Sequence, residues 1–477
     1  MIEAFDALWS QARPAFRRRR GWQRGRALAL GSLVALGRRT VGGLLCATGQ
    51  QFRDWSAAYR LFERERFEPQ ALFAPARRAV AEALHSHEPM IALIDDTLTR
   101  KRGRKVWGAA YRRDPLGPPF RPNLVWAQRF MQICAVLPEA DRSGAARAIP
   151  IDLRHCPTPP QPRQDATALQ WQEYRRRQKA MALTQCAIER ARALRQALDE
   201  DGQKRRPLIL VGDGGYTNGK ILRALPQRTA LIGRLRKDAK LYALPQAQIQ
   251  GPGRKRFYGA PLPTPERIRQ DPTIPWQTVR AFAAARWFDF HVKCLRPVRW
   301  RGAQDRDLTL LIVRPLAYRP SAQSKLLYRS PAYLVCSDPN LPLQTLLQAY
   351  LWRIEIELNF RDLKTLLGFG QAPVRTEPAV LRLPALIAAA YAFLHLAIPQ
   401  AFPNHDPNAL WPTPKWQRQK NKTRLSTANA IGLLRQNLWG QAIHATHLPH
   451  FEKQTALQPK SLFFTPTPQS AIFYASG

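Results

Sequence analysis

Acidic side chains are scarce in this 477-residue chain, which has 34 Asp and Glu residues against 74 Lys and Arg residues. The resulting formal net charge of +40 excludes an electrically balanced surface and predicts a polyanionic partner. Nucleic acid is the first candidate for that partner, and an anionic membrane surface is the second. The alternative is an arginine-rich surface that reflects the proteome of the source and serves no specific partner.

Cysteine is also scarce, and its positions exclude two kinds of site. The six cysteines are far apart in the sequence and form no CxxC pair; they occupy positions 46, 134, 156, 186, 294 and 336. This pattern argues against a disulfide framework and against a cysteine zinc site, and it is typical of proteins in a reducing cytoplasm. The sequence also contains no internal repeat.

Long apolar runs are missing as well. The longest, "PALIAAAYAFLHLAIP" at 384–399, is short for a membrane span and contains His395, so we predict a buried helix there. The opening "MIEAFDALWSQARPAFRRRR" has no apolar core of the length that a secretory signal needs. We therefore expect a cytoplasmic protein without a membrane partner.

Helical and strand-like segments alternate along the rest of the chain. Residues 1–85 read as helices, with a break at Thr48-Gly49 that is compatible with a helix-turn-helix. Three strands, a long helix and a further strand follow; they include "MIALIDDT" (90–97), "FMQICAVLP" (130–138), a helix at roughly 165–198, and "PLILVGDGG" (207–215). This order predicts a mixed α/β sheet.

Two of these strands deliver carboxylates where they end. "IALI" is followed by Asp95 and Asp96, and "LILVG" is followed by Asp213. Strands that are apolar throughout are buried on both faces, and the ligands of α/β folds gather at the edge where such strands end. A structural reading is also open, since Asp213-Gly214 is a common turn pair.

A third carboxylate, Glu357, lies in the segment "YLWRIEIELNFRDLK" at 350–364. On one continuous helix, the set Tyr350, Arg353, Glu357 and Lys364 would fall within about 60° of arc, at about 100° per residue. Most of the remaining circumference is apolar, which predicts a buried helix with one narrow polar stripe. A solvated ion pair between Arg353 and Glu357 is the alternative. A tyrosine and several cations around one acid favour a site for divalent metal and phosphates.

Three carboxylates from separate parts of an α/β core are able to hold two divalent ions roughly 3.5–4 Å apart. Such a pair activates a water or a 3′-hydroxyl and stabilises the leaving oxygen of a phosphodiester. Oxygen ligands suit Mg²⁺ or Mn²⁺, and these hard cations need neither Cys nor His. We therefore expect two Mg²⁺ or Mn²⁺ ions per active site.

The order of strand aspartate, later strand aspartate and helical glutamate resembles the DDE transposases, whose catalytic domain is ribonuclease H-like. The spacing Tyr350-x2-Arg353-x3-Glu357-x6-Lys364 is similar to the Tyr-Arg-Glu-Lys signature of one bacterial insertion-sequence group. The resemblance covers roughly residues 85–400. "DDT" and "DGGY", which begin at Asp95 and Asp213, resemble the first and second aspartate motifs of that group.

The resemblance implies an α/β fold with a ribonuclease H-like mixed-sheet core, a β-rich insertion, an N-terminal helical domain and a helical C-terminal region. The implied domains are a helical DNA-binding domain at 1–85, the first part of the catalytic core at 86–239, the insertion at 240–341, the second part of the core with the Glu-bearing helix at 342–400, and the C-terminal region at 401–477.

Site residues are carried over position by position. The resemblance implies that Asp213 and Glu357 are the second and third catalytic metal ligands. Asp95 and Asp96 compete for the first place, and we favour Asp96 because the family's aspartate directly precedes a threonine. Tyr216 is implied to be a structural neighbour of the site.

Residues that bind DNA are implied in the same way. Tyr350, Arg353 and Lys364 would contact phosphates near the cleaved end. An aromatic residue of the insertion stacks on a flipped base in the group; Trp287 and Trp300 are the candidates, although each also reads as a core residue. Two basic runs, "RKRGRK" (100–105) and "GRKRFY" (253–258), would add phosphate contacts or else be solvated loops.

The implied activity is cut-and-paste DNA transposition by metal-dependent strand cleavage and strand transfer. The implied partners are double-stranded DNA, in the form of terminal inverted repeats and target DNA, and a second copy of the chain in a homodimer. The protein would then work in the bacterial cytoplasm, on the nucleoid when bound to DNA. The alternatives are a metal-dependent nuclease without strand transfer and a non-catalytic DNA-binding protein on the same fold.

Overall fold

The computed structural model of this chain describes residues 1–114, 117–118, 120, 123–139, 143–245, 256–321, 323–403, 406–411 and 424–444. Of the basic run at 253–258, only residues 256–258 are therefore described; most of the C-terminal region at 401–477 also lies outside the described residues.

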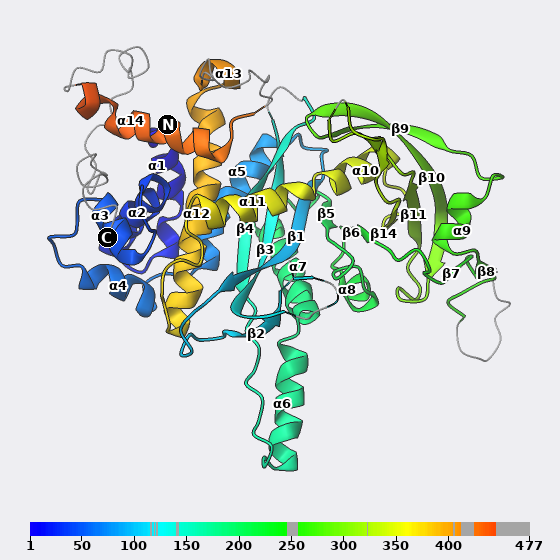
Figure 1. The fold of residues 1–477 in the computed structure, drawn as a ribbon, viewed down its shortest axis with the longest axis horizontal. Helices are drawn as coiled ribbons and strands as arrows, with labels where there is room; N and C mark the ends of the chain where they lie inside the picture. The colour runs from blue at the N-terminus through cyan, green and yellow to red at the C-terminus, as the bar shows by residue number, and fades with distance from the viewer. Residues whose placement is uncertain are drawn as a thin grey trace.

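A mixed sheet forms the centre of the molecule (Figure 1). In its core, β1 pairs antiparallel with β3 and parallel with β5, and β5 pairs parallel with β6. β4 pairs with one part of β3, and β2 pairs with another. The strands are β1 (Met90–Arg100), β2 (Ala110–Arg113), β3 (Leu124–Pro138), β4 (Ala146–His155), β5 (Leu208–Val211) and β6 (Thr229–Arg234). The mixed α/β architecture predicted from the sequence is confirmed.

A second group of strands continues this sheet beyond β6. β14 pairs antiparallel with β6, β11 with β14, and β10 with β11, so the segment between β6 and α10 extends the core sheet (Figure 1). The elements are β7 (Leu241–Tyr242), β8 (Pro261–Leu262), α9 (Pro265–Gln270), β9 (Gln277–Ala283), β10 (Arg286–Trp300), β11 (Leu308–Val313), β12 (Ala317–Tyr318), β13 (Leu327–Tyr328) and β14 (Ala332–Cys336).

Helices from both ends of the chain pack together beside the sheet, around α12 (Glu377–Ala401) (Figure 1). They are α1 (Ile2–Gln11), α2 (Arg19–Val34), α3 (Val41–Ala47), α4 (Ser56–Glu63), α5 (Ala74–Ala83) and α14 (Thr427–His444), with 3₁₀ turns η1 (Arg13–Ala15) and η2 (Gln70–Phe73) and a short α13 (Pro407–Leu410). The predicted break between α3 and α4 is present, and Gly49 has a φ of 68° there.

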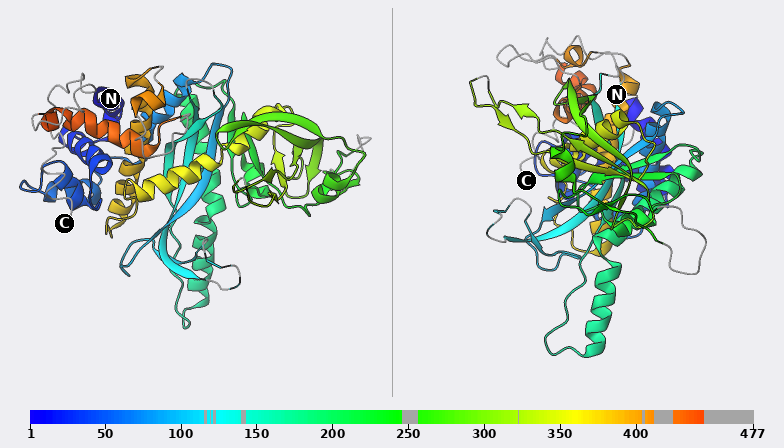
Figure 2. Two further views of the ribbon diagram at one scale, coloured as in Figure 1. Left: turned by 45° about the horizontal axis from the view of Figure 1, so that its top comes forward. Right: turned by 90° about the vertical axis from the view of Figure 1, so that its right-hand side faces the viewer.

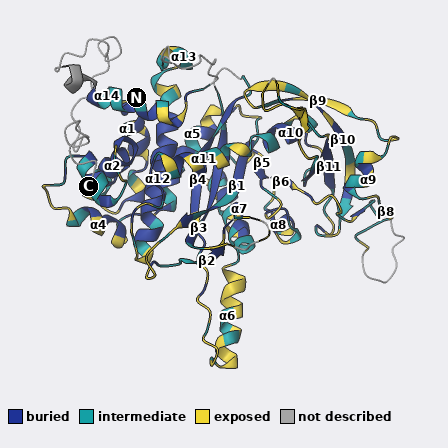
Figure 3. Ribbon diagram, in the orientation of Figure 1, coloured by how far each residue is buried: buried dark blue, intermediate teal, exposed yellow. Residues whose placement is uncertain are grey.

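Among the described residues, α12 is the one helix with the length and apolar composition to cross a membrane. Its apolar window is 89% buried, because α1, α2, α4, α5 and β4 pack around it (Figure 3). The run at 384–399 therefore supplies a central core helix, as the sequence predicted. Burial of the apolar side chains of α12 contributes a large hydrophobic free energy, at about 25 cal/mol per Å².

Two segments predicted to be single helices are each divided. The segment at 165–198 forms α6 (Ala168–Ala180) and α7 (Leu183–Glu200), and α7 leads into β5 and then α8 (Gly219–Ala224). The segment at 350–364 forms α10 (Leu343–Leu351) and α11 (Ile354–Thr365). At the second break, the amides of Glu355 and Ile356 donate to carbonyls only three residues back, 2.9 and 3.2 Å away, which tightens the chain.

Candidate active site

The side chains of β1 alternate between two apolar layers. Ile91 and Leu93 belong to the layer under α10 and α11, whereas Ala92 and Ile94 belong to the layer on the opposite face. Successive side chains of a strand point to opposite faces. Asp95 therefore lies on the α11 face of the sheet, and Asp96 lies on the other face.

Asp95 and Asp213 occupy matching positions with respect to two neighbouring parallel strands. The register joins Leu93 of β1 to Val211, the last residue of β5; Asp95 lies two residues further along β1, and Asp213 lies two residues past the end of β5. Val211 packs in the same apolar layer as Leu93. The two carboxylates thus meet on one face at the carboxyl edge of the parallel strands, where α/β folds bind their ligands.

Asp213 begins a tight turn. One of its carboxylate oxygens accepts hydrogen bonds from the amides of Gly215 and Tyr216, at 2.8 and 3.3 Å, and its carbonyl accepts from the Thr217 hydroxyl at 2.8 Å. The turn packs directly against β6, since a Cβ on Gly233 would collide with Thr217. The turn-forming role of Asp213 is therefore real. It occupies one oxygen and leaves the other without a hydrogen bond to the described residues.

Asp95 lies in surroundings that disfavour its negative charge, and Arg353 compensates for this only in part. Burial, together with the nearby charges of Asp213 and Asp96, raises the pKa of Asp95 to about 7, although the Asp96 amide donates to it at 2.8 Å. A cation placed beside Asp95 would favour its ionised form.

Arg353 joins Asp95 to Glu357. Its guanidinium lies 3.6 Å from an oxygen of Asp95 and 2.8 Å from an oxygen of Glu357. The predicted pair of Arg353 and Glu357 is present, and 45% of the Glu357 side chain is exposed. The helical acid thus stands at the rim of the site and is tied to the buried acid through one arginine.

The break between α10 and α11 changes the predicted polar stripe. Tyr350 is on α10, Arg353 is the N-cap residue of α11, and Glu357 and Lys364 are on α11. The four residues therefore do not share one helix. Lys364 is half-buried near Arg100; burial and that charge lower its pKa.

Asp96 is fixed by partners on the opposite face. The Tyr216 hydroxyl donates to one of its oxygens at 2.8 Å, and Arg129 lies 3.2 Å from the other. Burial and the charge of Asp96 raise the pKa of Tyr216, so the phenol stays protonated and keeps donating. The structure brings Asp213 and Asp95 together on one face, whereas it directs Asp96 away from them. The preference for Asp96, drawn from the following threonine, does not fit this geometry.

The donor set suits a hard divalent ion, because it consists of carboxylate oxygens alone. Within the described residues, however, no group of three or more His, Cys, Asp or Glu side chains lies close enough to hold a metal ion. The pair of Asp95 and Asp213 has the chemistry of a metal site, and the guanidinium of Arg353 lies between Asp95 and the third acid, Glu357.

Sequence reasoning missed two polar contacts that hold α11 in place. In the buried layer beneath it, Gln132 of β3 donates to Asn359 at 2.7 Å. In its first turn, the partly buried Glu355 pairs with Arg424 at 2.7 Å. For the first contact, the available signal was Asn359, a polar residue on the otherwise apolar part of the predicted helix. Nothing in the sequence identified the second, because its partners are 69 residues apart.

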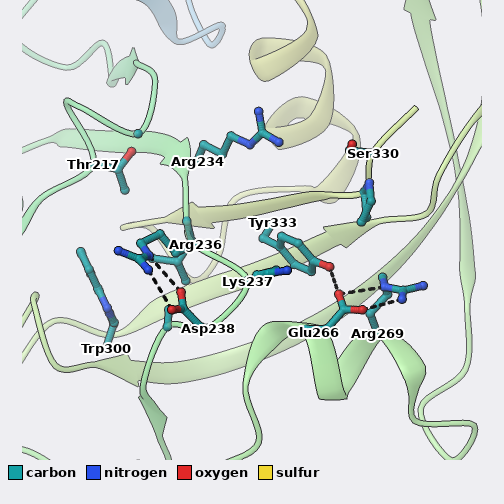
Figure 4. A pocket seen from close by; sticks show the side chains of 14 residues that line it. Thr217, Arg234, Arg236, Lys237, Asp238, Glu266, Arg269, Trp300, Ser330 and Tyr333 are labelled. Atoms are coloured by element: carbon teal, nitrogen blue, oxygen red, sulfur yellow. Dashed lines mark hydrogen bonds and ion pairs between the residues drawn. The ribbon is translucent and has the colours of Figure 1, made fainter. Parts of the chain in front are cut away.

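A cavity of about 940 Å³ opens beside the turn that follows Asp213 (Figure 4). Glu266 is satisfied there by Arg269, at 2.6 and 3.0 Å, and by the Tyr333 hydroxyl. The side chains of Arg234 and Lys237 also line it, and neither makes a hydrogen bond or an ion pair within the described residues. Trp300 forms part of the wall.

Trp287 lies apart from this cavity, at the start of β10, where it is 40% exposed and packs edge-on against Phe282 at 5.8 Å.

In the basic run 100–105, two residues have partners inside the fold. Arg100 pairs with Asp114 at 2.7 Å, and Lys101 donates to the Gly370 carbonyl at 2.8 Å. Arg102, Arg104 and Lys105 are exposed.

A family model described as "DDE superfamily endonuclease" matches residues 12–306 of the chain. The match includes β1 and β5 with their aspartates, and it ends before α11. No curated protein matches the chain.

Proposed function

The chain belongs to the DDE superfamily of endonucleases, and from this premise we propose that it is a DNA transposase of an insertion sequence. It would cleave strands at the ends of the element and transfer them to target DNA. The proposed relatives within the superfamily are the insertion sequences with the Tyr-Arg-Glu-Lys signature, because all four signature residues are present in the right spacing.

The observation that carries the proposal is the relation of Asp95 to Asp213. Two carboxylates that each lie two residues beyond the last paired residues of adjacent parallel strands, one of them with a pKa of about 7, are placed to share a divalent ion. We propose Asp95 and Asp213 as the first and second metal ligands and Glu357 as the third. Asp96 would support the site from the opposite face.

Two Mg²⁺ or Mn²⁺ ions bound there would supply an activated water or 3′-hydroxyl and would stabilise the leaving oxygen of the phosphodiester. The protein's own contribution is orientation. The turn after Asp213 fixes that carboxylate, the buried strand fixes Asp95, and Arg353 holds Glu357 at the rim.

DNA would approach the exposed rim of the site. Arg353, Tyr350 and Lys364 are the proposed contacts to phosphates near the cut, and the high positive charge of the chain supports binding of a polyanion. Terminal inverted repeats and target DNA are the proposed substrates. Because a cut-and-paste reaction joins two ends, the proposed working form is a homodimer in the bacterial cytoplasm.

Transposition of a mini-element tests this proposal. The donor plasmid carries a marker between candidate inverted repeats from the flanks of the coding region, and purified protein is supplied with Mg²⁺ or Mn²⁺. We expect excision and integration by the native protein, loss of both with Asp95→Asn, and retention of both with the matched variant Asp96→Asn, at reduced rate.

Other outcomes distinguish the rival functions. Cleavage without joined products would support a nuclease without strand transfer. Binding without any cleavage, under every metal condition, would support a non-catalytic DNA-binding protein. Normal cleavage by Asp95→Asn together with inactivity of Asp96→Asn would overturn the proposed first ligand.

A further inference from the structure

Helix α6 (Ala168–Ala180) projects from the body as an isolated arm. It extends past the end of the sheet where β2 lies, and Figure 1 and the right-hand view of Figure 2 show it standing clear of the other helices and strands. None of its residues is buried, and in Figure 3 its surface is mostly exposed. A helix of 13 residues without a packed face is marginal in water, so a free-standing arm of this kind is an unusual feature.

Local interactions hold the arm in helical form. Thr167 and Gln170 form a reciprocal capping box, with distances of 3.3 and 2.9 Å. Further along, Arg177 pairs with Glu173 at 2.9 Å across one helical turn. These contacts explain the helix. They do not explain why the chain places it in solvent.

The arm carries an unbalanced stripe of positive charge. Arg175, Arg176 and Lys179 are exposed and fall within roughly 100° of arc. Within the described residues, Arg175 and Lys179 have neither a hydrogen bond nor an ion pair, and Arg176 has only a 3.9 Å contact with Glu173. Arg175 and Lys179 are four residues apart, and like charges at that spacing destabilise a helix.

The helix dipole accounts for only part of this pattern. Cations in the last turn, such as Lys179, interact favourably with the helix C-terminus. Arg175 and Arg176 lie further from that end, so the dipole does not explain them. A polyanion lying along the stripe would offset the repulsion between its cations.

The stripe lies in the half of α6 that is nearer to the body. The chain runs outward from β4 to the tip, and α6 then returns to the body, where it joins the packed helix α7. The last two turns of α6 are therefore the ones nearest the sheet. A helix of this length is about 20 Å long, which corresponds to about six base pairs of duplex DNA.

We propose that α6 is a clamp on the backbone of double-stranded DNA, outside the cleavage site. Arg175, Arg176 and Lys179 would contact phosphates of the duplex that extends from the active site. This inference rests on the proposed function, since it takes DNA as the substrate. Trp171 and Tyr174 pack edge to face, with ring centroids 5.9 Å apart, which supports the helical form of the arm.

Salt-dependent binding of the full-length protein to a random-sequence duplex of about 40 base pairs tests the clamp, because phosphate contacts need no specific sequence. The test variant is Arg175→Gln with Arg176→Gln and Lys179→Gln, which keeps good helix-forming residues. The matched variant, Arg175→Lys with Arg176→Lys and Lys179→Arg, keeps the charge. Fluorescence anisotropy without divalent metal gives the affinity at several salt concentrations.

We expect the Gln variant to lose about 2 to 3 units of the slope of log K against log salt, and to bind about tenfold or more weakly near 0.1 M salt. The charge-preserving variant should keep the native slope. An unchanged slope in the Gln variant, or an equal loss in both variants, would overturn the clamp. Circular dichroism and thermal unfolding check that both variants keep the native fold.

Two further measurements separate this inference from its premise and from its rival. If native protein neither binds nor cleaves DNA, the proposed function fails. If native protein binds DNA and the Gln variant keeps the native slope but loses self-association in analytical ultracentrifugation, the arm contacts a second copy of the chain and the DNA clamp is overturned.

Discussion

The Tyr216 hydroxyl donates a 2.8 Å hydrogen bond to Asp96 of β1 from the turn that begins at Asp213. Since the backbone amide of Tyr216 also donates to Asp213, this one residue connects the two aspartate motifs. In the proposed function, this contact would give Asp96 a positioning role that is distinct from holding a metal.

Replacing Tyr216 by Phe tests that role. The variant leaves the half-buried Asp96 with only Arg129 as a partner, so we expect a loss of about 1 to 3 kcal/mol in the free energy of unfolding. Cleavage should slow while metal affinity changes little, because Asp95 and Asp213 are untouched. Urea unfolding and Mn²⁺ titration measure the two effects. A large loss of Mn²⁺ affinity would argue that Asp96 itself holds the ion.

The raised pKa of Asp95 predicts a pH-dependent stability of the metal-free protein. Its folded-state pKa is about 7 against 3.8 for an ordinary Asp, so the folded state binds the extra proton between these values. Stability should therefore fall as pH rises from about 4 to about 7, by about 2 to 4 kcal/mol from this group alone. Denaturant unfolding in EDTA, compared between the native protein and Asp95→Asn, measures the difference; the variant should lack this component.

Metal affinity should rise over the same pH range, because an ion at Asp95 must displace the proton. Isothermal titration with Mn²⁺ between pH 6 and pH 8 is the measurement. The matched comparison is Asp96→Asn, which should keep the pH dependence. Affinity that does not vary with pH would show that Asp95 is not a ligand.

Replacing Arg353 by Ala should lower the stability of the protein by an amount that depends on whether metal is present. Without its guanidinium, Asp95 and Glu357 lose their shared cation, so the metal-free variant should be less stable by about 1 to 3 kcal/mol. Mn²⁺ should recover part of this loss, since the ions replace the missing charge. Thermal unfolding with EDTA and with Mn²⁺ gives the comparison. A deficit of equal size in both conditions would separate Arg353 from the metal site.

Two glutamates of α11 form a matched pair for testing the third ligand. Glu357→Gln should abolish cleavage, by about a thousandfold or more, while duplex binding persists. Glu355→Gln should leave cleavage almost intact and lower stability by about 1 to 3 kcal/mol, because Arg424 loses its partner. Single-turnover cleavage of an end-containing oligonucleotide distinguishes them. Equal losses of activity would show that the effect of Glu357 comes from the helix as a whole.

The acids could be located from the sequence because each follows a wholly apolar run. The prediction that both strands end at these acids holds only for β5, which stops two residues before Asp213, whereas β1 continues through Asp95 and Asp96 to Arg100.

The choice between Asp95 and Asp96 could not be made from the sequence in this way. Residues 90–94 of β1 are all buried, so no alternation of polar and apolar residues marks the face that α11 covers. Only the packing of Ile356 and Phe360 on the layer of Leu93 decides that point.

The predicted helix boundaries were wrong where the sequence contains no residue that typically ends a helix. No Gly or Pro separates α6 from α7 at 181–182, or α10 from α11 at 352–353, so periodicity ran through both breaks. Strand β4 was not predicted because Pro150 interrupts its β-strand sequence pattern. Proline is tolerated there because β4 pairs only with β3 and lies at an edge of the sheet.

The pairing of β14 with β6 has a consequence for how this protein could have been assembled. Without β14, the backbone of β6 would lie open and invite other chains to add to it, which is a route to aggregation. The segment between β6 and α10 therefore cannot be removed without exposing the edge of β6. A related protein that lacks this segment would need another element to pair with the edge of β6. A shortened version of this protein should be designed with such an element.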